Sequence, residues 1–76
     1  MDLIPSERAV LGHIRDLFLE ASVRTYRLVA LTSRWPPLHY DAYHGGYAGL
    51  VKKGLIAKSA DEQLFSITNA GMKVIV

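Results

Sequence analysis

The fold is decided by residues 50–71, LVKKGLIAKSADEQLFSITNAG, where a helical pattern of apolar residues gives way to an alternating one. Gly54 ends the helical part, because glycine readily adopts the positive φ that helix ends use. Residues 55–59 and 63–67 then predict two strands, joined as a β-hairpin by the polar residues 60–62. Thr68 follows as the predicted N-cap of a short last helix. A lone hairpin is marginally stable, so Phe65 and Ile67 are expected to pack on helices elsewhere in the chain.

Two helices are predicted before this region. The first runs from Ser6 to Ala21, with Ser6 as its N-cap, and its apolar stripe is formed by Val10, Leu11, Ile14, Leu17 and Phe18. The second covers Tyr26 to Ser33, with Thr25 as its cap, and is expected to bury Leu28, Val29 and Leu31. It ends at Trp35-Pro36-Pro37, because proline cannot continue the helical ladder. Trp35 is expected to be half buried, as a cover over the edge of the core.

The third helix is predicted from Leu38 to Lys53. At 100° per residue, one third of its circumference carries an apolar stripe, formed by Tyr40, Tyr43, Tyr47, Leu50 and Val51. The other side carries small residues, which include Gly45, Gly49 and Ala48. Glycine inside a helix costs about 0.5–1 kcal/mol relative to alanine, so these glycines need an explanation. Either a partner or a DNA backbone approaches the helix closely, or tyrosine packing holds an intrinsically poor helix together, or the helix is broken near Gly45-Gly46.

The order of three helices, a two-stranded β-hairpin and a short C-terminal helix resembles the winged helix-turn-helix fold, an α+β class, in one domain over residues 1–76. Residues 50–56 resemble the end of a recognition helix that runs into the first wing strand, and residues 65–71 resemble the second wing strand and its capped helix, as in MarR-type and PadR-type regulators. Residues 6–16 are similar to the first helix of LexA-type domains. The resemblance implies a small DNA-binding transcription regulator, with residues 38–53 as its recognition helix. Winged helices also serve as protein-interaction modules, so the fold alone leaves both functions open.

The composition indicates a small globular chain with 76 residues and no cysteine. The lack of cysteine excludes disulfides and thiolate metal sites, and favours a reducing cytosol. No apolar run approaches the ~18 residues that cross a bilayer, and the first residues lack the features of a signal peptide. We therefore expect a cytoplasmic protein without a membrane segment.

The charge is unevenly distributed along the chain. Residues 24–58 hold six basic side chains against the single carboxylate of Asp41, between two mildly acidic ends. This basic middle suits an anionic partner such as double-stranded DNA. The predicted phosphate ligands are Arg24, Arg27, Arg34, Lys52 and Lys53, with Lys58 near the hairpin tip. The side chains predicted to meet base edges or a partner surface are Tyr40, Asp41 and His44, together with His39 at the start of the helix.

Several features favour a protein partner instead. The exposed side of the third helix carries few of the side chains that read bases, and the hairpin tip carries Asp61 and Glu62, where a phosphate-binding wing needs lysine or arginine. The rival hypothesis is therefore a protein-interaction module, such as a small phage or mobile-element factor that docks on a host complex through Gly45, Ala48 and Gly49. The apolar C-terminal residues either form a homodimer or close the core beside the first helix; these residues are Met72, Val74, Ile75 and Val76.

Catalysis and metal binding have little support in the sequence. No Ser/His/Asp set, phosphate-binding glycine loop after a strand, or paired carboxylates are present, so we expect no enzyme and no cofactor. His39 and His44 point in different directions from the third helix, and His13 lies on another helix, so no metal site is expected.

Overall fold

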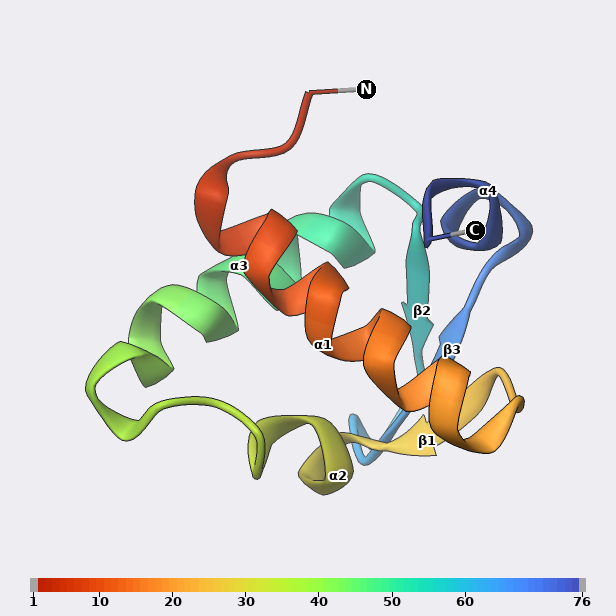
Figure 1. The fold of residues 1–76 in the computed structure, drawn as a ribbon, viewed down its shortest axis with the longest axis horizontal. Helices are drawn as coiled ribbons and strands as arrows, with labels where there is room; N and C mark the ends of the chain where they lie inside the picture. Colours follow the sequence, from red (N-terminus) through yellow and green to blue (C-terminus); the bar gives the residue numbers. More distant parts are fainter. Residues whose placement is uncertain (1, 76) are drawn as a thin grey trace.

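The computed structural model describes residues 2–75, and it places four α-helices and a three-stranded antiparallel sheet in this range. The elements follow in the order α1 (Pro5–Ala21), β1 (Thr25–Arg27), α2 (Leu28–Thr32), the short 3-10 helix η1 (Pro37–His39), α3 (Tyr40–Lys52), β2 (Ile56–Lys58), β3 (Leu64–Ile67) and α4 (Asn69–Ile75). Helix α1 crosses in front of α3 in Figure 1, and the sheet and α4 lie at one side of this helical pair. The α+β class is confirmed, with one strand more than the sequence predicts.

The additional strand, β1, corrects the prediction of a helix from Tyr26 to Ser33. β1 pairs with β3, which is the central strand of the order β1-β3-β2. Thr25 is part of this strand and not a helix cap; its hydroxyl lies 2.9 Å from the hydroxyl of Ser66 on β3. Tyr26 lies opposite Phe65 in the same ladder. The second helix is therefore shortened to α2, five residues that begin where β1 ends.

Helix α1 begins one residue earlier than predicted, and Ser6 is not its N-cap. Pro5 occupies the first helical position, where its fixed φ is favourable and its missing N–H costs no hydrogen bond. Ile4 therefore takes the N-cap position, and its backbone N–H donates to the Glu7 carboxylate at 3.1 Å. Glu7 thus accepts the N–H of the N-cap residue, and no side chain within residues 2–75 forms the cap that was expected from Ser6.

Helix α3 begins at Tyr40 and not at Leu38 as predicted, because Pro37–His39 form the 3-10 helix η1. The predicted boundaries on either side of the hairpin are confirmed. Gly54 follows α3 with a φ of +77°, a conformation that glycine adopts without steric cost. Thr68 caps α4, because its hydroxyl accepts the backbone N–H of Gly71 at 3.0 Å. The same hydroxyl donates to the carbonyl of Gly54 at 2.6 Å, so one side chain joins the start of α4 to the end of α3.

The core lies between α1, α3 and the sheet, and its buried members are Val10, Leu11, Ile14, Leu17, Leu31, Trp35, Tyr47, Leu50, Leu55, Ile56, Phe65 and Ile67. The expected packing of Phe65 and Ile67 is confirmed. Trp35 is only 3% exposed, so it is a core residue and not a half-buried cover. Val29 is 66% exposed, which contradicts its predicted burial. Among the C-terminal residues, Met72 and Ile75 pack against the core and Val74 is exposed, while Val76 lies outside the described residues.

Along residues 2–75, none of the helices combines the length and the apolar character that a membrane crossing requires.

Candidate interaction face

Helix α3 presents one exposed face that carries five of the residues predicted to meet a partner. Its exposed side chains at neighbouring helical angles are Asp41, His44, Gly45, Ala48 and Lys52. The middle of this face is flat, because an added Cβ at Gly45 would meet no atom within 4 Å. The helix continues through residues 45 and 46 without a break.

The other two glycines of α3 face α1 and not a partner. A Cβ at Gly46 would lie 2.5 Å from the carbonyl oxygen of Ser6, and a Cβ at Gly49 would lie 2.0 Å from a carboxylate oxygen of Glu7. The close approach that these glycines predict is therefore made within the fold, where α1 crosses α3. Gly49 was predicted to bind a partner, but it lies at this crossing. It is half buried, at the border of the exposed face.

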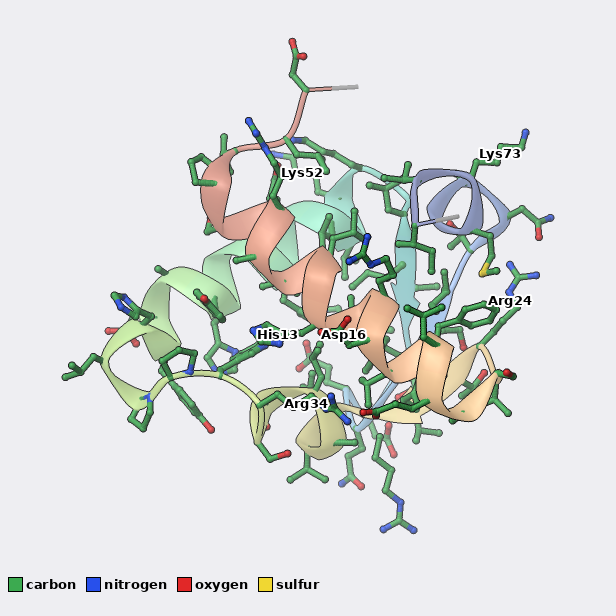
Figure 2. The ribbon with its side chains drawn as sticks, viewed as in Figure 1. His13, Asp16, Arg24, Arg34, Lys52 and Lys73 are labelled. Carbon is green, nitrogen blue, oxygen red and sulfur yellow. The ribbon has the colours of Figure 1, made fainter. Side chains whose placement is uncertain are left out.

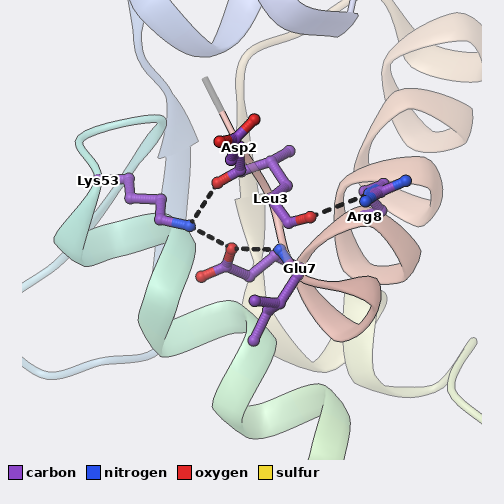
Figure 3. A network of polar contacts seen from close by, with 6 residues as sticks. Asp2, Leu3, Glu7, Arg8 and Lys53 are labelled. Atoms are coloured by element: carbon purple, nitrogen blue, oxygen red, sulfur yellow. Dashed lines mark hydrogen bonds and ion pairs between the residues drawn. The ribbon is translucent and has the colours of Figure 1, made fainter.

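Lys53 forms hydrogen bonds at the same crossing of α1 and α3 (Figure 3). Its Nζ donates to the Glu7 carboxylate at 2.5 Å and to the carbonyl of Asp2 at 3.0 Å. Glu7 is only 4% exposed. The hydrogen bond from Lys53 holds the pKa of Glu7 below its usual range, against the opposing effect of burial, so this carboxylate remains charged at neutral pH. A predicted phosphate ligand is thus engaged in a carboxylate pair between α1 and α3.

Two further basic side chains have partners on other sides of the molecule. Arg34 forms an ion pair with Glu20 near the end of α1. Arg24 donates to the carbonyl of Ile67 and to the side chain of Asn69, both at 2.9 Å, where β3 leads into α4. Figure 2 shows Arg24, Arg34 and Lys52 on different sides of the chain. The basic middle of the sequence therefore does not gather on one surface.

The hairpin tip is acidic and well ordered by hydrogen bonds. Asp61 accepts the hydroxyl of Ser59 at 2.6 Å and the backbone N–H of Gln63 at 3.1 Å, and these bonds lower its pKa. Lys58 donates to Glu62 at 2.5 Å and lowers the pKa of Glu62 in the same way. Both carboxylates are therefore charged at neutral pH, and Lys58, the predicted basic residue of the tip, lies beside one of them.

Two hollows connect α3 to the hairpin and to α2. The α3 hollow has a volume of about 330 Å³ and is lined by Leu28, His44, Tyr47, Ala48, Val51, Lys58 and Glu62. The wing-tip hollow has a volume of about 640 Å³ and is lined by Arg27, Leu28, Val29, Thr32, Asp61, Glu62, Gln63 and Leu64. They share Leu28 and Glu62, so they form one continuous surface with the exposed residues of α3. We call this surface, made of the exposed α3 residues and both hollows, the α3–wing face.

Aromatic contacts fix the start of α3 beside this face. The ring of His44 packs edge-on against buried Trp35, with centroids 4.9 Å apart, and Tyr40 lies against both rings. The Tyr40 hydroxyl donates to the carbonyl of Thr32 at 3.0 Å. His39 stacks on Tyr43, with centroids 6.2 Å apart. The predicted residues His39, Tyr40 and His44 are thus held by a rigid cluster, with His44 at the edge of the α3–wing face.

The sequence missed the apolar members of the wing-tip hollow. Val29 was expected to be buried and Leu64 was only assigned to a predicted strand, and the structure leaves them 66% and 39% exposed. No local signal identifies them, because α2 is shortened by the strand β1, whose pairing partner β3 lies far along the chain. Within residues 2–75, there is no cluster of three or more side chains suited to metal binding.

Comparisons of this chain with protein-family models, with curated proteins and with solved structures found no match. Its function is therefore inferred from its own residues and their geometry.

Proposed function

We propose that the chain is a winged-helix module that binds a protein partner through the α3–wing face. The order of its elements supports the winged-helix assignment: α3 follows two helices, and the hairpin of β2 and β3 lies beside it as a wing. The strand β1 completes the sheet with this hairpin. In this layout, α3 and the hairpin tip form one continuous surface for a partner.

The charge balance of the α3–wing face is the observation that carries the proposal. This face holds three cations, Arg27, Lys52 and Lys58, and as many carboxylates, Asp41, Asp61 and Glu62. Affinity for DNA depends on an excess of cations that neutralise phosphates and release counterions. A face without this excess lacks the main source of DNA affinity, whereas mixed charge at a polar rim is ordinary for protein interfaces.

The shape and composition of the face also suit a protein partner. Its centre is flat around Gly45 and Ala48, and its hollows are lined by apolar side chains that include Leu28, Val29 and Leu64. Protein interfaces commonly combine an apolar centre with a charged rim. A flat helix face that adjoins apolar hollows allows close packing of a partner's side chains.

A second candidate function is that of a small DNA-binding transcription regulator. It is favoured by Lys52 on exposed α3 and by Arg27 at the wing-tip hollow, because neither has a carboxylate partner within residues 2–75. The Lys58–Glu62 pair is exposed and contributes little to stability, so a phosphate could replace the carboxylate at low cost. In this case Asp41 and His44 would be the residues that meet base edges.

A site-specific photo-crosslinker distinguishes the two functions. In living cells, a crosslinker at Ala48 is expected to capture a protein of defined mass, in a product that nuclease treatment leaves unchanged. The same group at Arg15, exposed on α1, is the matched control and is expected to give no such product. Gly45→Arg should abolish the product while the circular dichroism of the purified variant is unchanged.

Fluorescence titration with mixed duplex DNA supplies the opposite test. The proposal predicts no measurable binding at about 50 mM salt, since DNA affinity is largest at low ionic strength. Tight binding that weakens steeply with salt, and is lost in Arg27→Ala and Lys52→Ala, would refute the protein-binding proposal in favour of the regulator.

A further inference from the structure

We infer that the wing-tip hollow binds an apolar side chain of the partner that is followed or preceded by a lysine or arginine. This inference rests on the proposed function and names the chemistry of the partner segment. The hollow was not predicted from the sequence, and it lies at the α2 end of the α3–wing face. The occupant is a short protein segment and not a nucleic acid, because much of the lining is apolar and the carboxylate of Asp61, unpaired within residues 2–75, stands at its rim.

The apolar part of the hollow is exposed and of suitable size. Val29 on α2 and Leu64 on β3 are 66% and 39% exposed, and half-buried Leu28 lies with them in the lining. The volume of about 640 Å³ lies within the range of hollows that bind small organic groups, and exceeds that of one aliphatic side chain. Covering these side chains would remove apolar surface from water, which is favourable in proportion to the area covered.

The walls of the hollow are fixed before any partner binds. The backbone N–H of Leu28 donates to the carbonyl of Gln63 at 2.7 Å, which joins the start of α2 to the hairpin. Asp61 holds the hairpin turn through Ser59 and the N–H of Gln63. A site that is already ordered loses little conformational entropy on binding.

The charge of the rim selects the flanking residue. Asp61 and Glu62 line the hairpin side of the hollow. Glu62 is paired with Lys58, whereas Asp61 is held by Ser59 and Gln63 and has no cation partner among residues 2–75. Arg27, on the opposite wall, is the single cation among the lining residues. The carboxylate of Asp61, which has no cation partner in the described part of the chain, lies at the hairpin tip, so a cationic side chain beside the apolar anchor is complementary there and an acidic one is repelled.

Selection from a phage-displayed library of random peptides on the immobilised chain tests this inference. Enriched peptides are expected to carry a leucine, isoleucine, methionine or aromatic residue within two positions of a lysine or arginine. One such peptide is then synthesised, and its affinity is measured by fluorescence polarisation. Val29→Asp should weaken binding at least about tenfold, as expected for a buried contact. This substitution places an acidic residue in the first turn of α2, where it favours the helix, so the fold should be retained.

Two conservative variants test the charge of the rim. Asn at position 61 retains an oxygen that can accept both turn hydrogen bonds, so Asp61→Asn and Glu62→Gln remove charge without removing the turn. Each should weaken the peptide severalfold, and the loss should diminish at high salt. Arg15→Gln, on α1 and outside the α3–wing face, should leave peptide affinity unchanged.

The outcomes separate this inference from the proposed function. Failure to enrich any peptide, enrichment of acidic peptides, or affinity unchanged by Val29→Asp would each overturn the wing-tip assignment. A peptide that binds Val29→Asp normally but no longer binds Gly45→Arg would also overturn the wing-tip assignment. This result would support exposed α3 as the protein-binding site.

Discussion

Two adjacent glycines in α3 should respond in opposite directions to the same substitution. Alanine at position 45 adds a Cβ in open space, whereas at position 46 the Cβ would lie 2.5 Å from the carbonyl oxygen of Ser6, roughly 1 Å closer than an ordinary contact. Both changes gain about 1 kcal/mol of helix propensity. Only Gly46→Ala forces the backbone of α1 away from α3, and overpacking of this kind typically costs about 1–3 kcal/mol.

The net effects follow from these two contributions. Because the obstructing atoms at Ser6 belong to the backbone, we take the upper end of the overpacking cost and expect Gly46→Ala to lower the free energy of unfolding by about 2 kcal/mol. Gly45→Ala should raise it by about 1 kcal/mol. In a domain of this size, 1 kcal/mol shifts Tm by about 4–8 °C, so the two variants should be separated by well over 10 °C.

Urea unfolding provides the measurement, followed by the fluorescence of Trp35, which is the single tryptophan and is buried in the core. Far-ultraviolet circular dichroism of both variants controls for retention of the helices. If Gly46→Ala stabilises the chain as much as Gly45→Ala does, α1 does not pack against α3 at the depth described, and the explanation of the glycines is wrong.

Three further predictions concern side chains that hold the elements together. Glu7 has a lowered pKa, so its pair with Lys53 stabilises the fold at pH values above the ordinary carboxyl range, and this contribution is lost as the pH falls through the folded-state pKa. The urea midpoint should therefore decline less between neutral and acidic pH in Glu7→Gln than in the unchanged chain. An equal decline would contradict the pairing. Thr68→Val removes the cap of α4 and should lower the free energy of unfolding in urea by about 1–2 kcal/mol, while Thr68→Ser, which keeps the hydroxyl, should lower it much less. Equal losses would show that the hydroxyl does not stabilise the helix. Leu31→Ala should lower the free energy of unfolding by about 3 kcal/mol, because Leu31 is fully buried. Val29→Ala should change it very little, because Val29 is exposed. Similar Tm shifts in the two variants would disprove this placement of α2.

The parts of the fold that the sequence predicts well are those with strong local signals. The apolar stripe of α1, the glycine after α3, the hairpin of β2 and β3, and the cap at Thr68 each depend on neighbouring residues. Local propensity and periodicity are sufficient for these elements.

The strand β1 could not be predicted in this way. Thr25 resembles a helix cap, and the apolar residues that follow have helical spacing, so the local pattern favours a helix from Tyr26. The strand forms because β3, almost forty residues later, supplies its hydrogen-bonding partner. Tertiary pairing thus overrides the local preference.

The candidate site shows a similar division. The exposed side chains of α3 follow from the helical angles, and Asp41, His44 and Ala48 lie where the pattern places them. The pairing of Arg34, Lys53 and Lys58 with carboxylates does not follow from the pattern, because two of these partners lie on α1. A charge count along the chain therefore overestimates the cations that remain available to an anionic partner.

The position of β3 at the centre of the sheet has a consequence for the assembly of the chain. β3 is the last strand to be synthesised, yet both other strands hydrogen-bond to it and not to each other. A nascent chain that has not yet reached Leu64 can form α1, α2 and α3 but has neither ladder of the sheet. Formation of the sheet must therefore wait until nearly the whole domain has left the ribosome, so folding is expected to be a late and cooperative event and not a stepwise one from the N-terminus.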